Sequence, residues 1–115
     1  MPHRAERVSK EMVRILSNII LYELNDPRMS LVAITRAKLT PDLREAKVYV
    51  SALGEEKQKK LVMHGLNHAK GFIQKMLAER LKIRILPRIQ FVLDDSIEKG
   101  MRIEKLLEKI SEEEE

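Results

Sequence analysis

Residues 3–25 carry apolar residues at spacings of about three to five positions. This spacing places the apolar side chains on one stripe of an amphipathic helix. The helix must end before Asn25-Asp26-Pro27, because these residues favour a turn and proline disfavours helical geometry in the residue before it. The predicted buried stripe consists of Val8, Met12, Ile15, Leu16, Ile19 and Leu24.

Two strand patterns follow this helix. Residues 31–40 are rich in residues that favour strands, and residues 46–52 alternate between apolar and polar side chains. Thr40-Pro41-Asp42-Leu43-Arg44 predicts a turn between them, so the two segments should form an antiparallel hairpin. On the second strand, the side chains predicted to face the core are Ala46, Val48, Val50 and Ala52.

Two helices are predicted after the hairpin, over residues 56–69 and from Gly71 to Leu81. Glycine inside a helix costs roughly 1 kcal/mol relative to alanine, so Ala69-Lys70-Gly71 predicts a kink between the two helices. Gly65 predicts a close backbone approach. The positions predicted to face inward are Leu61, Val62, Gly65, Leu66, Ala69, Phe72, Ile73, Met76, Leu77 and Leu81.

The remaining pattern predicts a third strand and a last helix. Residues 83–93 turn to strand, with Pro87 at its start or on an edge because proline cannot donate to a sheet. Asp94-Asp95-Ser96 offers N-cap candidates for a helix that extends to Ile110. The acidic run that ends the chain is expected to fray.

The predicted order is therefore αββααβα, which gives an α+β fold with a three-stranded mixed sheet and helices on one face. Residues 1–110 should form a single domain, and residues 111–115 an acidic tail. Because the other face of the sheet is left open, Lys47 and Tyr49 should lie on it.

Composition narrows the class of protein. The 115 residues include no cysteine, which excludes disulfides and cysteine metal sites, and no apolar run is long enough to span a membrane. The N-terminus has no apolar signal core, so we expect a soluble cytoplasmic protein. Residues 1–90 carry 18 basic and 9 acidic side chains, whereas residues 91–115 carry 4 and 9. A basic body predicts a polyanionic partner.

The cations are the main functional candidates, because clustered charge can neutralise phosphates and release counterions. The segment 51–90 contributes nine of them, among them Lys57, Lys59 and Lys60 on the first crossover helix. The hairpin adds cations, and Arg36 and Lys38, two residues apart, should share one face. The predicted RNA-binding residues are Arg36, Lys38, Arg44, Lys47, Lys70, Lys75, Arg80, Lys82, Arg84 and Arg88.

Other chemistry finds little support in the sequence. His64 and His68 have the spacing of two metal ligands on a helix, but the glutamate of a zinc hydrolase motif and a third ligand are missing. Asp94-Asp95 fits helix capping better than a magnesium site. Arg28 is expected to tie its turn to Asp26. No phosphate-binding loop or nucleophile elbow occurs, so neither enzyme activity, a metal nor a cofactor is expected.

The motifs, taken in order along nearly the whole chain, resemble those of bacterial ribosome-binding factor A. They are Arg4-x-x-Arg7-Val8, Asp26-Pro27-Arg28, Asp42-Leu43, Ala46-Lys47-Val48-Tyr49-Val50-Ser51, Leu66-x-x-Ala69-Lys70-Gly71-Phe72-Ile73 and Pro87-x-Ile89-x-Phe91-x-x-Asp94. The resemblance implies a KH-like fold of the αββααβ type. It also implies an interhelical Ala-x-Gly kink, here Ala69 and Gly71, in place of the Gly-x-x-Gly loop of ordinary KH domains.

The same resemblance implies a non-catalytic factor that binds the immature 30S subunit and helps the 16S rRNA precursor mature, mostly in the cold. We expect a monomer, with neither DNA nor a membrane as partner. The alternative is a protein-interaction module, in which the acidic end and the first helix dock on a ribosomal protein or a maturation GTPase.

Overall fold

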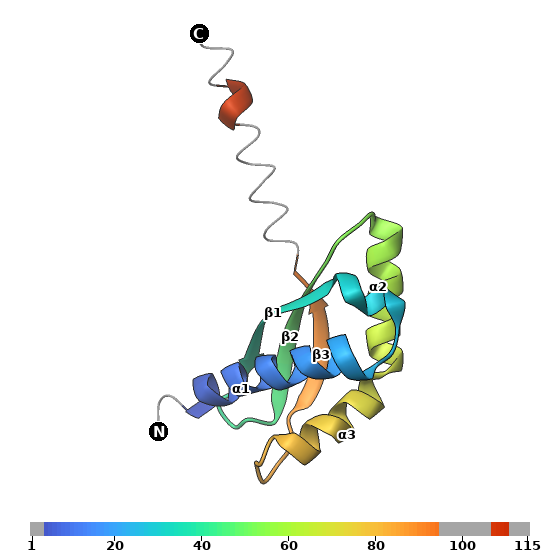
Figure 1. The fold of residues 1–115 in the computed structure, drawn as a ribbon. Coiled ribbons are helices and arrows are strands. Elements are labelled where there is room, and N and C mark those ends of the chain that lie inside the picture. The colour runs from blue at the N-terminus through green and yellow to red at the C-terminus, as the bar shows by residue number, and fades with distance from the viewer. Residues whose placement is uncertain (1–3, 95–106, 111–115) are drawn as a thin grey trace.

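A computed structural model describes residues 4–94 and 107–110 (Figure 1). Three strands form one sheet in the order β1-β2-β3. The central strand β2 (Glu45–Ala52) pairs antiparallel with β1 (Val32–Leu39) and parallel with β3 (Arg88–Leu93). The predicted α+β fold with a mixed three-stranded sheet is therefore confirmed.

Three helices, α1 (Arg4–Asn18), α2 (Glu56–His68) and α3 (Lys70–Arg80), cover one face of the sheet (Figure 1). The core lies between this face and the helices. Side chains alternate along β2 as predicted, and those buried beneath the helices are Ala46, Val48, Val50 and Ala52.

The first helix does not run to residue 25 as one α-helix. After Asn18 the chain forms a π-helical turn, η1 (Ile19–Glu23). A π-turn contains more residues than an α-turn and so shifts the side chains that follow around the axis. Ile19 and Ile20 continue the buried stripe of α1, whereas Leu24, which follows the π-turn, is only partly buried.

A 3₁₀ helix, η2 (Pro27–Leu31), precedes β1, which delays the start of the predicted strand by one residue. The Asp26 carboxylate accepts a hydrogen bond from the Arg28 backbone N–H at 3.0 Å and one from its Nη2 at 2.7 Å. The prediction that Arg28 ties this turn to Asp26 is confirmed.

The predicted hairpin turn is present between β1 and β2. Oδ1 of Asp42 accepts hydrogen bonds from the Thr40 hydroxyl at 2.7 Å and from the Arg44 backbone N–H at 3.1 Å. Leu43 has a φ of 61°, in the left-handed region, and its side chain is buried in the core. The sequence reads as a polar turn, so the burial of this leucine was not predicted.

Acid should weaken these turns. Hydrogen bonds from Arg28 hold the pKa of Asp26 below its usual value, and the Thr40 hydroxyl lowers the pKa of Asp42. The stability that they add is present above the unfolded-state pKa of about 3.9 and is lost as pH falls through the lower folded-state values. We expect the thermal unfolding midpoint to fall in this range. The Asp26→Asn variant should show a smaller decrease of the midpoint in acid than the unmodified protein. The control variant Glu79→Gln, changed at an exposed site, should show the same decrease as the unmodified protein.

A β-bulge interrupts β1 between Ile34 and Arg36. The extra residue, Thr35, puts two successive exposed side chains on the strand. Its hydroxyl donates to Oδ2 of Asp94 at 2.9 Å. The bulge keeps Ile34 partly buried and Arg36 exposed, although a regular strand would place both on one face.

The two crossover helices bury most of the positions predicted, including Val62 and Leu66. Two of the predicted positions are wrong, because Leu61 and Phe72 are each 46% exposed. Both lie at the margin of the apolar stripe, where the sequence pattern does not separate core from surface. The strand predicted from residue 83 begins at Arg88.

Gly65 provides the predicted close approach. A Cβ atom built there would lie 2.9 Å from Cε of Met29 and 3.2 Å from Nη2 of Arg28. The glycine therefore lets η2 pack directly against α2.

The C-terminal predictions lie largely outside the described residues. They include the helix cap at Asp95, the first part of the last helix and the acidic tail at 111–115; residues 107–110 are helical. Among the described helices, none is long and apolar enough to cross a lipid bilayer.

Candidate nucleic-acid interface

The open face of the sheet carries the hairpin cations. Arg36 is paired with Tyr49, and Lys38 with Lys47, in the register of β1 and β2. The Arg36 guanidinium carbon lies 4.1 Å from the centre of the Tyr49 ring, a cation–π contact. Arg36 thus covers one face of the Tyr49 ring, so a base would have to stack on the guanidinium or on the opposite ring face.

A hollow of about 520 Å³ lies beside these residues at the start of β2. Four cations line it, and they come from three strands and the start of α3: Lys38, Lys47, Lys70 and Arg88. We call this hollow the basic groove. Parallel pairing places Lys47 opposite Gln90 and Glu45 opposite Arg88, and Glu45 is the carboxylate that lines the groove.

The groove continues at the hairpin turn. Arg44 and Arg88 line an adjoining hollow, and the Arg88 backbone N–H donates to the Arg44 carbonyl at 2.8 Å. The structure therefore brings six of the predicted cations onto one side of the molecule, namely Arg36, Lys38, Arg44, Lys47, Lys70 and Arg88.

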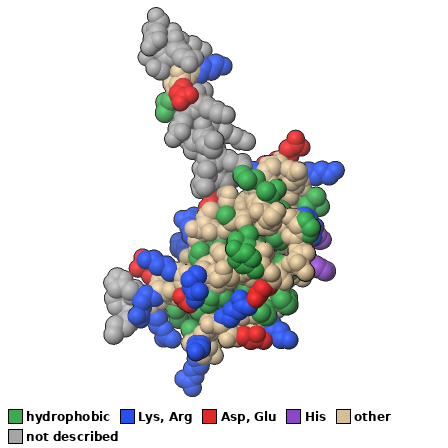
Figure 2. Space-filling view, in the orientation of Figure 1, with side chains coloured by type: hydrophobic (Ala, Val, Ile, Leu, Met, Phe, Trp, Pro, Cys, Tyr) green, Lys and Arg blue, Asp and Glu red, His purple; other side chains and the backbone are tan. Residues whose placement is uncertain are grey.

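Arg80 and Lys82 lie in a second hollow, together with Arg4 and Arg7 of α1. Arg80 is also hydrogen-bonded to Glu23. Figure 2 shows Lys and Arg side chains gathered around the start of α1 and below α3. The two α1 arginines were not among the predicted RNA-binding residues, although their spacing places them on the polar face of that helix.

The other predicted cations differ in exposure. Lys75 on α3 and Arg84 before β3 are exposed, and neither lines the basic groove or the second hollow. Lys57 and Lys60 are exposed on α2. The expectation that Lys59 is one of the cations available to neutralise phosphates is wrong, because its side chain is buried and only 4% exposed. It lies three residues before the buried Val62, on the core side of α2, where its aliphatic stem can pack.

The two crossover helices meet at an angle (Figure 1). The residue that leaves helical geometry is Ala69, with φ −85° and ψ 1°, and its carbonyl accepts from the Ile73 backbone N–H at 2.9 Å. Gly71 lies inside the first turn of α3 and is exposed, and a Cβ atom built there would meet nothing within 4 Å. The backbone next to Lys70 is therefore open to a partner.

Residues with metal-binding potential are dispersed. His64 and His68 are both exposed on α2, and Asp94 accepts the hydrogen bond from Thr35. Over residues 4–94 and 107–110, no group of three or more His, Asp or Glu side chains could hold a metal ion.

Comparisons with known proteins agree with one another. A sequence model of the family Ribosome-binding factor A matches residues 4–107. The chain is 46% identical over 112 residues to Ribosome-binding factor A of Halothermothrix orenii, which covers 97% of this chain and 92% of the relative. It is 48% identical over 109 residues to that of Acetivibrio thermocellus, covering 94% and 89%.

Solved structures give the same result. The crystal structure of ribosome-binding factor A from Thermus thermophilus superposes with a TM-score of 0.69 at 29% identity, over 77% of this chain and 94% of that one. A Thermus thermophilus ribosome binding factor A homology model, fitted into the cryo-EM map of a 30S–RbfA complex, gives 0.67 at 29% identity, over 81% and 97%.

Proposed function

The chain belongs to the ribosome-binding factor A family, and we propose from this that it binds the immature 30S subunit and assists maturation of the 16S rRNA precursor. It acts in the cytoplasm, as a monomer and without catalysing a reaction, and matters most in the cold. The Thermus thermophilus homology model fitted into the map of a 30S–RbfA complex supports the part of this proposal that concerns binding to the 30S subunit.

The observation that carries the proposal is the basic groove. Its four cations come from strands and a helix that are distant in the sequence, so the fold itself gathers them. Lysine and arginine side chains on a concave surface recognise the phosphate backbone through charge and shape. Six predicted cations on one side form a surface that can follow an RNA strand.

Binding of this kind needs no chemical step. A protein that binds one conformation of the rRNA more tightly than others shifts the population toward that conformation, by an amount set by the difference in affinity. The groove and the exposed backbone at the α2–α3 junction would supply that difference.

A ribosome profile on a sucrose gradient tests the proposal. We expect the protein to sediment with free small subunits and to be absent from polysomes. A pulldown with and without ribonuclease separates RNA contact from protein contact. Loss of small-subunit proteins after nuclease treatment supports RNA binding, whereas their retention supports docking on a ribosomal protein or a maturation GTPase.

Gly71→Leu should separate binding from folding. A side chain at Gly71 meets open space within the protein, so the free energy of unfolding should stay the same or rise by up to about 1 kcal/mol. If the junction faces the subunit, the added side chain should weaken binding by about tenfold or more. Sedimentation binding assays and urea unfolding measure the two effects.

Ala78→Leu is the matched control, since it places the same leucine side chain at an exposed site on α3 away from the junction. If both variants bind the small subunit as tightly as the unmodified protein does, the subunit does not contact the junction.

A further inference from the structure

The outer edge of β1 is unpaired in the part of the chain that the structure describes. The strand lies at the end of the order β1-β2-β3, so β2 occupies only one of its two edges. An open strand edge presents a row of backbone donors and acceptors to which another extended segment can add.

The register identifies which backbone groups face outward. Leu53 donates to the Leu31 carbonyl at 3.2 Å, and Thr40 donates to the Glu45 carbonyl at 3.0 Å. Residues of an antiparallel pair alternate between bonding to the partner strand and pointing away from it. Leu31 and Thr40 therefore both face β2, and the bulge between Ile34 and Arg36 shifts the alternation by one residue. The residues whose N–H and C=O groups face outward are Val32, Ile34, Ala37 and Leu39.

A groove runs along this edge, between β1 and α1. One hollow of about 580 Å³ lies beside the second half of β1, against Ala5, Ser9 and Val13. A smaller one of about 130 Å³ lies beside the first half, against Ser17 and Leu21. These helix residues recur every four positions and form one stripe. We call the two hollows together the edge groove.

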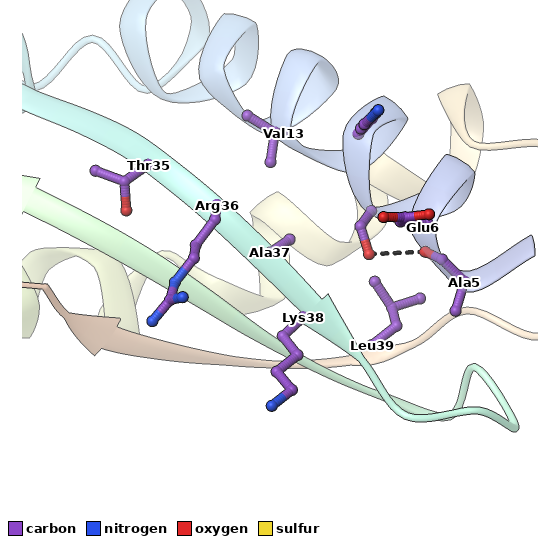
Figure 3. A pocket seen from close by; sticks show the side chains of 10 residues that line it. Ala5, Glu6, Val13, Thr35, Arg36, Ala37, Lys38 and Leu39 are labelled. Atoms are coloured by element: carbon purple, nitrogen blue, oxygen red, sulfur yellow. Dashed lines mark hydrogen bonds between the residues drawn. The ribbon is translucent and has the colours of Figure 1, made fainter. Parts of the chain in front are cut away.

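The two sides of the edge groove differ in chemistry. Ala37 and Leu39 of β1 face the small and apolar side chains of α1, whereas Arg36 and Lys38 extend away from the helix (Figure 3). A strand added beside β1 would alternate in the same way. Its side chains would meet a mostly apolar wall on one face, where Glu6 and Lys10 of α1 also line the hollow, and two cations on the other.

We propose that the edge groove is a docking site for an extended segment of another protein in which apolar and acidic residues alternate. The segment adds to the sheet as a fourth strand beside β1. Its backbone bonds to the outward-facing groups of β1, its apolar side chains pack against α1, and its carboxylates pair with Arg36 and Lys38.

The positive charges on β1 argue against a second copy of this chain as the bound partner. Two copies of β1 paired edge to edge would place Arg36 and Lys38 of one copy beside those of the other, and like charges on neighbouring strands repel. RNA is disfavoured as well, since it offers no strand of peptide groups and gains little from the apolar wall.

The probe for this proposal is a synthetic eight-residue peptide of alternating valine and glutamate, matched in length to β1. Controls are a valine–lysine peptide and the valine–glutamate peptide with proline at two central positions. In ¹⁵N spectra of the full chain we expect the valine–glutamate peptide to slow hydrogen exchange at Val32, Ile34, Ala37 and Leu39. The amides of Ala33, Arg36 and Lys38 should change little, because they already bond to β2. Binding of the two controls should be weaker by about tenfold or more.

Two variants keep the test independent of folding. Ala37→Pro removes one outward-facing donor, and Val13→Arg fills the groove from the helix side; each should weaken peptide binding by about tenfold or more. Leu61→Arg, at an exposed site on α2, is the control and should bind as the unmodified protein does. Charge reversal at Arg36 and Lys38 to glutamate should exchange the preference between the glutamate and lysine peptides.

Two results would overturn the proposal: protection at successive amides, or equal peptide binding by the two variants and the control. Sedimentation with small subunits is measured separately, so failure of the peptide to bind leaves the proposed ribosome function standing.

Discussion

Raising the salt concentration from about 50 to about 200 mM should weaken binding to the small subunit by about 10³–10⁵-fold, if roughly six to ten phosphates are neutralised. The basic groove and the hairpin arginines supply six of the predicted cations on one side of the molecule. Each phosphate that they neutralise releases counterions, and added salt opposes that release.

Single substitutions in the basic groove should change the salt dependence in a graded way. Lys47→Gln or Lys70→Gln should weaken binding and reduce the slope of log K against log salt by about one. Lys60→Gln, which removes an exposed cation of α2 outside the groove, is the matched control. Filter binding or sedimentation at constant Mg²⁺ measures the slopes. A flat salt profile in the unmodified protein would point to a protein partner instead.

Leu66→Ala should cost about 2–5 kcal/mol of unfolding free energy, which is a large share of the roughly 5–15 kcal/mol of a typical domain. Leu66 is 0% exposed and lies next to Gly65, where α2 packs closely on η2. Truncation removes apolar burial and leaves a cavity that the surrounding side chains cannot fill completely.

Leu61→Ala makes the same chemical change in the same helix at a side chain that is 46% exposed. We expect its cost to stay within about 0.5 kcal/mol, as for most surface substitutions. Urea unfolding of both variants measures the difference. Equal losses would restore the prediction that Leu61 faces inward and contradict the packing described for α2.

The sequence predicts the fold well where one face of a helix or strand is buried and the other is exposed to solvent. The alternation on β2 shows this, because core and open-face residues differ sharply in polarity. Prediction fails where an added residue changes the period, as at the π-turn after Asn18 and the bulge at Thr35. Neither has a composition signal, since only tertiary contacts make the extra residue favourable.

The candidate site is predictable only in part for a related reason. The neighbourhood of Lys38 and Lys47 follows from the hairpin, which is local in sequence. That Lys70 and Arg88 lie in the same groove as these two lysines depends on the strand order, which the sequence leaves open. Arg4 and Arg7 line a hollow together with Arg80, because the fold brings the start of α1 near the end of α3, and no local pattern in the sequence encodes this.

The parallel pairing of β3 with β2 also determines when the sheet can be completed while the chain is being synthesised. The hairpin can close as soon as residue 52 has emerged from the ribosome, but the second partner of β2 is complete only at residue 93. At about 5–20 residues per second, the intervening segment takes roughly 2–8 seconds to appear. For that time the nascent hairpin exposes both of its edges, and the sheet becomes whole only once β3 has been synthesised.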